Sequence, residues 1–348
     1  MKRKTVLAIG AHPDDASIIW YDGKLLALEG KGWANTGSYY DRLPEKAQAD
    51  VTPAVWELSL DSAGMSVYFS TDSSAVNVKW TLLKDKLAEP HMPATGVSGL
   101  DLYAREKSGK WAFQGNGRPE GISNNASFKV EPESECLLYL PLYNGLKSLE
   151  IGVPKGKTLS TPDLSPVKRG KPIVFYGTSI TQGACASRPG MAATSIVGRM
   201  LDVPVINLGF SGSGKMEPAL AMLLAELDPS IYVLDSLHNM PADERVEPFV
   251  KTLRKAHPST PILLFEESSC LGISPTDKGR KLRAICEKLE NEGMKDLCFM
   301  PNTDMLGSDG EGTVDGVHPN DLGMMRQAMV FVKRLRPLLP SKTKPEII

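Results

Sequence analysis

The sequence predicts a two-part α/β protein, in which an antiparallel β-sandwich precedes a three-layer domain built on a parallel sheet. Three observations lead to this fold class. Short β-type runs fill the first half, strand and helix signals alternate in the second half, and the character of the chain changes near Val167–Pro172 (VKRGKP). A chain of 348 residues is long enough for two units that each bury a core.

Residues 18–166 carry alternating runs of β-branched and aromatic residues with Gly, Ser, Asn and Asp between them, a pattern typical of an antiparallel, jelly-roll-like sandwich. The expected strands are VWELSLDS, MSVYFST, AVNVKWTLL, LDLYARE, SFKVE and LLYLPLY. A loop before them, Tyr39–Arg42, either reaches the ligand cleft of the second domain or packs the domain junction. The aromatic side chains suit either a sugar-binding surface or the core, and we expect most of them in the core. They are Trp56, Tyr68, Trp80, Tyr103 and Trp111.

Residues 170–340 alternate between apolar strand candidates and amphipathic helix candidates, which predicts a parallel sheet covered by helices on both faces. The expected strands are Pro172–Tyr176, Val203–Leu208, Ile231–Asp235, Ile262–Glu266 and Leu297–Pro301. The expected helices are Ala192–Leu201, Pro218–Leu227, Val246–Lys255, Asp277–Asn291 and Asp321–Leu338. The tail, residues 341–348, is rich in Lys and Pro and is expected to be loose.

Composition excludes several classes of function. Forty Lys and Arg balance 41 Asp and Glu, so there is no electrostatic case for nucleic acid or an anionic membrane as partner. No apolar run approaches the roughly 20 residues that span a bilayer. Five cysteines without a CxxC pair predict buried thiols rather than a disulfide framework or a thiolate zinc site. No clear signal peptide is present, so a cytoplasmic location is the default and export stays open.

The segment AHPDD near the start of the chain resembles the first motif of PIG-L-type zinc deacetylases, with His12, Asp14 and Asp15 as candidate ligands. Such a site needs a further histidine in an HxxH-like motif, and the four other histidines provide none. We therefore interpret residues 1–17 as a leader or extra strand, with no metal site.

The segment IVFYGTSITQG, residues 173–183, is the strongest chemical signal. An apolar strand runs into Gly177, a sharp turn places Ser179, and helix-compatible residues follow. Ligands of open α/β sheets bind past the carboxyl ends of the strands, where a serine hydroxyl is exposed and its N–H favours a developing oxyanion. The alternative is a serine that only caps a helix.

The segment DGVHPNDLG, residues 315–323, supplies an Asp-x-x-His turn before the last helix, in what we take to be another strand-end loop. Asp315 can hold one imidazole nitrogen of His318 while the other faces a nucleophile, as a serine triad requires. Asn320 or Asp321 can cap the helix that follows. A capping loop with an incidental histidine is the alternative.

Two further strand-end loops offer oxyanion donors. In INLGFSGSG, residues 206–214, Gly212 allows its N–H to approach a ligand that a larger residue would obstruct. In YVLDSLHNM, residues 232–240, Asn239 can present its amide N–H₂ group. Together with the Ser179 N–H, these groups can form an oxyanion hole.

Four such motifs in this order resemble the SGNH (GDSL-type) serine hydrolases over roughly Lys171–Leu339, and Gly99–Tyr103 (GLDLY) resembles the N-terminal domain of a two-domain subset. The resemblance implies Ser179 as nucleophile, His318 as base and Asp315 as its orienting carboxylate. It also implies Gly212 and Asn239 as oxyanion donors.

The chain departs from the family pattern in two places. The usual GDS reads Gly177-Thr178-Ser179, so a hydroxyl replaces the carboxylate beside the nucleophile. The usual GxND keeps only its asparagine, which leaves His238 either on the rim of the site or in contact with substrate.

The expected reaction is hydrolysis of short-chain O-acyl esters, acetyl above all, through an acyl-serine and without a metal or organic cofactor. Family members with two domains often act on carbohydrate, which makes an oligosaccharide ester a candidate substrate. The alternatives are a general arylesterase or thioesterase, and a carbohydrate-binding protein without catalysis. The oligomeric state is not predicted.

Overall fold

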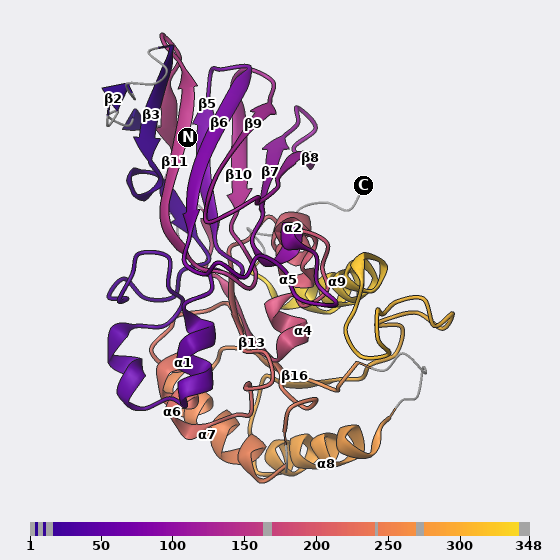
Figure 1. Cartoon of the computed structure of the whole chain (residues 1–348). Helices are drawn as coiled ribbons and strands as arrows, with labels where there is room; N and C mark the ends of the chain where they lie inside the picture. The colour runs from indigo at the N-terminus through magenta and orange to yellow at the C-terminus, as the bar shows by residue number, and fades with distance from the viewer. Residues whose placement is uncertain are drawn as a thin grey trace.

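The computed structural model describes residues 4–5, 10–11, 17–162, 169–240, 243–268 and 275–340. A body of antiparallel strands adjoins a body of parallel strands and helices (Figure 1). None of the helices in these ranges is long and apolar enough to cross a bilayer. The predicted fold class, an α/β domain with an antiparallel N-terminal domain, is confirmed.

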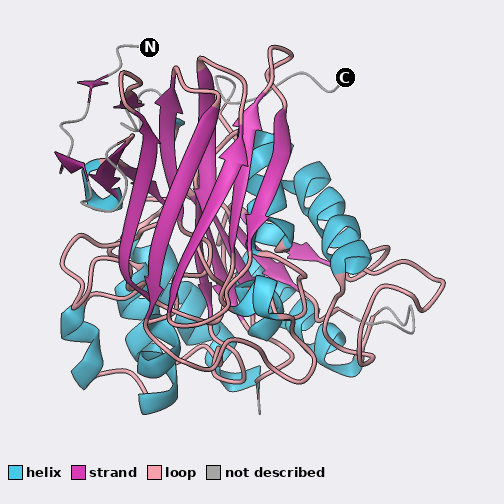
Figure 2. Cartoon of the chain, turned by 45° about the horizontal axis from the view of Figure 1, so that its top comes forward, coloured by secondary structure: helices cyan, strands magenta, loops and turns pink. Residues whose placement is uncertain are grey.

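The strands of the first half form two antiparallel sheets. They are β1 (Lys4–Thr5), β2 (Gly10–Ala11), β3 (Ile18–Asp22), β4 (Ala27–Glu29), β5 (Ser66–Thr71), β6 (Ala75–Leu82), β7 (Leu100–Arg105), β8 (Trp111–Gly117), β9 (Ser123–Lys129), β10 (Ser134–Tyr139), β11 (Leu146–Pro154) and β12 (Leu159–Thr161). One sheet has the order β1-β12-β5-β10-β7-β8, with β4 also pairing with β5, and the other has the order β2-β3-β11-β6-β9. Figure 2 shows these strands gathered together, with most of the helices below and beside them.

The sandwich core lies between the two sheets. It includes Phe69 and Leu138 from one sheet and Trp80 and Ile151 from the other, all essentially inaccessible to solvent. Of the five aromatic side chains expected mostly in this core, Trp80 lies in it, whereas Tyr68 and Tyr103 are buried in a separate cluster. Trp56 and Trp111 are only partly buried. The candidate zinc ligands His12, Asp14 and Asp15 lie outside the described residues.

One predicted strand is wrong. VWELSLDS falls in a helix, α1 (Pro53–Ser59), rather than in the sandwich. The side chain of Thr52 caps this helix by accepting a hydrogen bond from the Val55 N–H at 3.3 Å, and proline occupies the first helical position. These start signals outweigh the β-branched and aromatic composition, and Val55 and Ser59 face inward at helical spacing. The other short helix of this half is α2 (Ala94–Val97).

The second half has one parallel sheet with the order β14-β13-β15-β16-β17. Its strands are β13 (Ile173–Gly177), β14 (Val205–Gly209), β15 (Ile231–Asp235), β16 (Ile262–Phe265) and β17 (Leu297–Met300). Its helices are α4 (Ser179–Gln182), α5 (Ala193–Leu201), α6 (Pro218–Leu224), α7 (Val246–Ala256), α8 (Asp277–Asn291) and α9 (Asp321–Leu335). Short 3₁₀ turns occur at Gly23–Leu25, Glu45–Ala49, Pro189–Met191, Asp243–Arg245 and Arg336–Leu338.

Helices cover both faces of the parallel sheet because its strands are apolar on both faces. Tyr176 and Leu234 pack with α6, α7 and α8 in one core, whereas Phe175 and Val233 pack with α5 and α9 in another. Because the strands are parallel, their carboxyl ends lie at the same edge of the sheet, where α/β proteins bind ligands.

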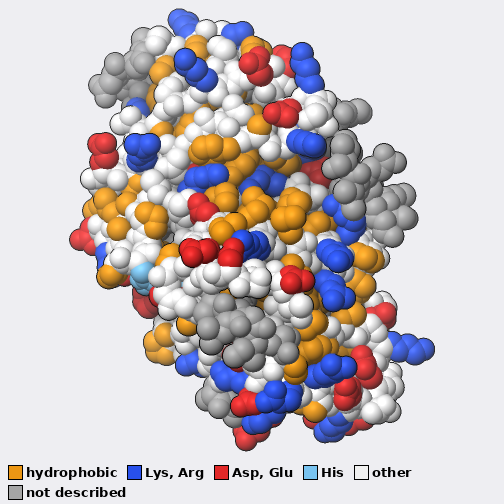
Figure 3. Space-filling view, turned by 90° about the vertical axis from the view of Figure 1, so that its right-hand side faces the viewer, with side chains coloured by type: hydrophobic (Ala, Val, Ile, Leu, Met, Phe, Trp, Pro, Cys, Tyr) orange, Lys and Arg blue, Asp and Glu red, His pale blue; other side chains and the backbone are white. Residues whose placement is uncertain are grey.

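Hydrophobic side chains, with Lys and Arg among them, form a band on one face of the molecule (Figure 3). Large hydrophobic side chains are exposed on elements that Figure 1 places on this side, including Phe113 of β8, Met200 of α5 and Met329 of α9. The guanidinium of Arg188 lies 3.8 Å from the centre of the Phe113 ring, so part of this apolar surface carries a cation.

Candidate active site

Ser179 begins α4 immediately past the end of β13. Thr178 is the residue before the helix, and its hydroxyl accepts a hydrogen bond from the Ile180 N–H at 3.3 Å. Thr178, not Ser179, therefore caps the helix, which leaves the Ser179 hydroxyl available for other partners. Gly177 is required by close packing, because a Cβ there would lie 2.3 Å from the Asp235 carbonyl oxygen.

The structure brings Ser179, His318 and Asp315 into one hydrogen-bonded chain. Ser179 Oγ lies 2.9 Å from His318 Nε2, and His318 Nδ1 lies 2.7 Å from Asp315 Oδ2. The carboxylate can only accept, so it holds the proton on Nδ1 and leaves the Nε2 lone pair facing the serine. This is the arrangement in which an imidazole can deprotonate a serine hydroxyl.

Asp315 is fixed by hydrogen bonds from its own turn. Its Oδ1 accepts from the N–H groups of His318 at 2.7 Å and Val317 at 3.0 Å. Partial burial raises the pKa of Asp315, but the hydrogen bonds from the His318 backbone, the His318 ring and the Val317 backbone outweigh it and lower this pKa to about 2. The carboxylate is therefore ionised at every pH at which the protein is expected to work.

The turn that carries Asp315 and His318 is not itself a strand end, contrary to the sequence-based expectation. β17 ends at Met300, and the pair lies in the long loop before α9, next to an isolated bridge between Thr313 and Pro319. Asn320 caps α9 by accepting from the Gly323 N–H at 3.1 Å, so the helix start fixes the turn.

Gly212 and Asn239 lie side by side. When the Asn239 amide is assigned from its hydrogen-bond network, its oxygen accepts from the N–H groups of Gly212 and Ser213, each at 3.3 Å. The planar amide then turns its N–H₂ group away from this loop. Gly212 has a φ of +67°, and a Cβ there would meet nothing within 4 Å. Backbone conformation rather than crowding inside the protein therefore requires the glycine.

His238 precedes Asn239 and faces Glu267, with 3.9 Å between His238 Nδ1 and Glu267 Oε2. Its Nε2 is buried and has no hydrogen-bond partner among the described residues. Burial lowers the pKa of His238, although Glu267 opposes this shift. The side chain is therefore a neutral polar group beside the loop that carries Asn239.

A group of buried and half-buried polar residues near Ser179, the junction cluster (Arg42, Asp61, Tyr143 and Gln182), joins the sandwich to the parallel sheet. The guanidinium of Arg42 donates to the carbonyl oxygens of Gly209 at 2.6 Å and Asn207 at 3.3 Å on β14, and to that of Asp61 at 2.9 Å. Burial lowers the pKa of Arg42 to about 10, because most of its partners are neutral carbonyl groups. Of the two roles expected for the Tyr39–Arg42 loop, Arg42 fills that of packing the junction.

The other members of the junction cluster contact the segments that carry Ser179 and Gly212. Gln182 donates to Asp61 Oδ2 at 3.3 Å and accepts from the Ser211 N–H at 3.0 Å. The Tyr143 hydroxyl donates to the carbonyl oxygen of Ser179 at 3.3 Å. Sequence reasoning missed Asp61, Tyr143 and Gln182, although Gln182 lies in the same segment as Ser179.

Two more side chains beside His318 were also missed. The rings of His91 and His318 lie 5.6 Å apart, and Cys185 lies close enough for its Sγ to share a metal ion with both imidazoles. Burial raises the pKa of the Cys185 thiol to about 12, and Asp315 adds to the shift, so Cys185 is not a competing nucleophile. His91 comes from the sandwich half, and no local pattern links it to this site.

Comparisons with known proteins agree with this geometry. The model of the GDSL-like lipase/acylhydrolase family matches residues 170–336. The GxDLY model, which describes the N-terminus of SGNH-hydrolase-type esterases, matches residues 18–159. No curated protein sequence gives a significant match to the chain.

Three solved structures are similar over most of the chain. A protein described as a GDSL-like lipase from Bacteroides ovatus is 36% identical with a TM-score of 0.83, over 92% of this chain and 98% of its own. A salicylyl-acyltransferase from a tetracycline biosynthetic pathway is 20% identical with a TM-score of 0.71, over 97% of both chains. A family two carbohydrate esterase from Cellvibrio japonicus is 13% identical with a TM-score of 0.60, over 92% of this chain and 98% of its own.

The last two structures share the fold alone, whereas the family models and the Bacteroides ovatus protein establish the relationship. The chain therefore belongs to the GDSL-like lipase/acylhydrolase family, carries the GxDLY-type N-terminal domain, and is a hydrolase of ester bonds.

Proposed function

We propose that this enzyme removes short O-acyl groups, acetyl above all, from carbohydrate through a covalent acyl-serine intermediate. The observation that carries the proposal is the chain from Ser179 Oγ through His318 to Asp315, with steps of 2.9 and 2.7 Å. His318 Nε2 accepts the serine proton as Oγ attacks the ester carbonyl. It then returns this proton to the leaving alkoxide.

Water completes the cycle by the same route. His318 takes a proton from water, the hydroxide attacks the acyl-serine, and the carboxylic acid leaves as Ser179 regains its proton. Asp315 stays ionised and stabilises the imidazolium that forms in each half-reaction.

The oxyanion is held by the Ser179 N–H and the Asn239 side-chain N–H₂ group. The Gly212 N–H, which the sequence predicts as a third donor, donates instead to the Asn239 side-chain oxygen at 3.3 Å. The contact between Asn239 and the Gly212 loop supports this assignment, because it fixes the side of the amide on which the N–H₂ group lies. Loss of one such donor typically lowers kcat by about 10²–10³. We therefore expect Asn239→Ala to lower kcat for p-nitrophenyl acetate by that factor, with a smaller effect on KM.

A short acyl group and a polar acceptor suit the surroundings of the serine. The side chains of His318 and Asp315 are 23% and 38% exposed, so the pair is not enclosed at the end of an apolar channel. The His91 ring lies 5.6 Å from that of His318, and the Asn239 amide contacts the Gly212 loop, so polar groups are present beside the pair. The fold of this chain is similar to that of family two carbohydrate esterases, one of which was solved in complex with cellohexaose. A sugar ester is therefore the first substrate to test.

The test compares p-nitrophenyl acetate, butyrate and octanoate, followed by acetylated oligosaccharides, for wild type and Ser179→Ala. We expect hydrolysis that falls with chain length and drops by about 10⁴ or more in the variant. The exposed Ser108 on the β7–β8 turn provides a matched control, because its hydroxyl bonds within its own turn, to Glu106 Oε2 and the Lys110 N–H. Turnover of aryl esters but of no acetylated sugar would favour a general arylesterase, and hydrolysis that survives Ser179→Ala would reject the serine mechanism.

A further inference from the structure

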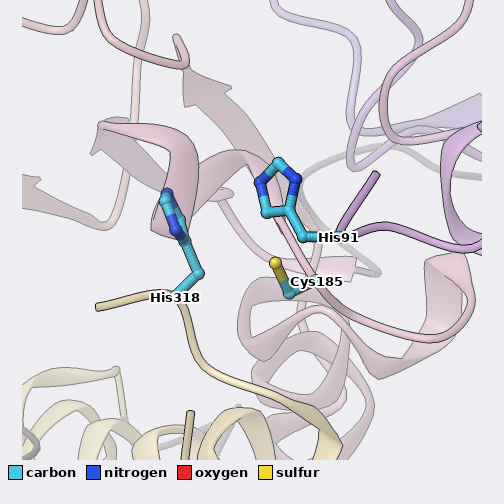
Figure 4. A group of neighbouring side chains, drawn as sticks. All are labelled: His91, Cys185 and His318. Atoms are coloured by element: carbon cyan, nitrogen blue, oxygen red, sulfur yellow. The ribbon is translucent and has the colours of Figure 1, made fainter. Parts of the chain in front are cut away.

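Three potential metal-binding side chains converge at the entrance to the Ser179–His318 pair. One donor atom each from His91, Cys185 and His318 lies within 4.8 Å of the other two. Figure 4 shows the three side chains coming from separate segments and gathering at one place. His91 precedes α2, Cys185 follows α4, and His318 precedes α9, so only the fold brings them together.

The backbone turns that carry two of these side chains are held by their surroundings. His91 lies at the tip of a tight turn in which Glu89 and Met92 exchange two backbone hydrogen bonds of 3.0 Å. Met92 is buried in the same apolar cluster as Cys185, which anchors the turn beside the thiol. Cys185 has a φ of +66°, a conformation that non-glycine residues rarely adopt and that the surrounding contacts maintain.

His318 offers only one nitrogen to an ion. Its Nδ1 donates to Asp315 Oδ2 at 2.7 Å, so the free lone pair is on Nε2, the atom that also faces Ser179 Oγ. A histidine whose second nitrogen is bound to a carboxylate is the usual form of a zinc ligand, because the carboxylate fixes the ring and makes Nε2 more basic.

We propose that His91, Cys185 and His318 form an inhibitory binding site for a thiophilic divalent ion, Zn²⁺ in the first place. One thiolate and two imidazoles are a ligand set that Zn²⁺ accepts, with the fourth position left to water. Binding replaces the S–H bond of Cys185 by a metal–sulfur bond and releases the proton to solvent, with no change of oxidation state.

The ligand spacing is close to what a tetrahedral ion needs. Bonds of about 2.0–2.3 Å place tetrahedral ligands about 3.5 Å apart, so atoms within 4.8 Å need to approach by little more than about 1 Å. Because His91 is exposed on a loop turn, its ring can make most of this movement.

The consequence for catalysis rests on the proposed function. An ion bound to Nε2 occupies the lone pair that would take the Ser179 proton, so the occupied enzyme cannot form the acyl-serine. The site would therefore link esterase activity to the free concentration of zinc, whereas the existence of the site does not depend on the esterase mechanism.

Binding is tested directly with Co²⁺, which replaces Zn²⁺ and absorbs in the near ultraviolet when a thiolate binds it. The titration uses the inactive Ser179→Ala protein, which keeps all three ligands. We expect a thiolate-to-Co²⁺ band that saturates at one ion per chain, disappears in Cys185→Ser and is weakened in His91→Gln. Cys298→Ser is the matched control, because Cys298 is a free, partly accessible thiol elsewhere and its loss should leave the band unchanged. No band, or an equal band in Cys185→Ser, would overturn the proposal.

Inhibition is tested separately with p-nitrophenyl acetate and Zn²⁺ buffered at known free concentrations. We expect wild type to be inhibited reversibly by Zn²⁺, with EDTA restoring full activity, and the inhibition constant to rise about tenfold or more in Cys185→Ser and His91→Gln. Equal inhibition of wild type and both variants would reject these residues as the inhibitory site. If wild type hydrolyses no ester, the proposed function fails, and the Co²⁺ titration still decides the metal site.

Discussion

The groups that face substrate and the groups that hold them differ in burial and in the span of their contacts. Ser179 begins the short helix α4, and His318 and Asp315 lie on a partly exposed turn. Asp315 is fixed by hydrogen bonds from residues two and three positions away. Arg42 and Gln182 of the junction cluster are fully buried and contact residues more than 100 positions away. The segments that carry Ser179, His318 and Asp315 provide the chemistry, whereas the junction cluster holds the segments that carry Ser179 and Gly212 from the buried side.

The largest effect expected from this comparison is at Asp315. In Asp315→Asn the amide N–H₂ group faces His318 Nδ1, so the ring keeps its proton on Nε2 and cannot accept one from Ser179. We expect kcat for p-nitrophenyl acetate to fall by about 10⁴ with little change in stability.

Asp309→Asn is the matched control for this variant. Asp309 is another carboxylate of the same long loop, and it pairs with Arg326 at 2.7 Å instead of with His318. We expect Asp309→Asn to keep kcat within a factor of about two, because surface ion pairs contribute little to the position of distant groups. A loss of less than about tenfold in Asp315→Asn would show that the carboxylate does not set the tautomer of His318.

A variant of the junction cluster should mainly lose stability, in contrast to Asp315→Asn, which should mainly lose activity. Arg42→Met leaves the carbonyl oxygens of Asp61, Leu58 and Gly209 buried without their donor. We expect the free energy of unfolding in urea to fall by about 3–5 kcal/mol, because each unsatisfied buried group costs about 1–3 kcal/mol and the loop can relax only in part. The β14 loop that carries Gly212 should loosen, which lowers kcat more than it raises KM.

Arg283→Met is the matched control for the junction. Arg283 lies on the surface of α8 and contacts Glu287 at 3.1 Å with both side chains exposed. Its replacement should change the free energy of unfolding by about 0.5 kcal/mol or less. Equal effects of Arg42→Met and Arg283→Met would contradict the supporting role given to the junction cluster.

The same contrast explains which parts could be predicted from the sequence. Strand β15 and helix α8 were predicted with their observed ends, because apolar runs and amphipathic spacing are local signals. Ser179, His318 and Asp315 were found in the same way, since each belongs to a short motif. Their catalytic roles stay predictions until the variants are measured.

The rest depends on contacts between distant segments. Nothing near His91 in the sequence shows that its ring lies 5.6 Å from that of His318. The partners of Arg42 on β14 are about 165 residues away, and a backbone carbonyl oxygen leaves no mark in the side-chain pattern. The strand predicted at VWELSLDS was wrong for a different reason. Its composition favours a strand, but the helix start signal Thr52-Pro53 lies just before it.

Asp235 should make the stability of the buried part of the site depend on pH. This buried carboxylate at the end of β15 has no cation among its described hydrogen-bond partners. Its Oδ2 accepts from the Thr181 hydroxyl at 2.8 Å, and its Oδ1 has no partner among the described residues. Burial raises the pKa of Asp235 to about 7, with Thr181 opposing and Glu267 adding to the shift.

A folded-state pKa above that of the unfolded chain means that the folded protein binds the proton more tightly. The stabilising contribution of Asp235 is therefore complete below about pH 4 and is lost as the pH rises through 7. Between pH 5 and pH 8, wild type should lose about 2–3 kcal/mol relative to Asp235→Asn, which cannot ionise. Urea unfolding of both proteins at the two pH values measures this difference. Asp228→Asn, which removes an exposed carboxylate paired with Lys171, should follow the wild-type pH dependence. Parallel pH dependences for wild type and Asp235→Asn would show that Asp235 is ionised in the folded protein throughout this range, which would contradict the raised pKa.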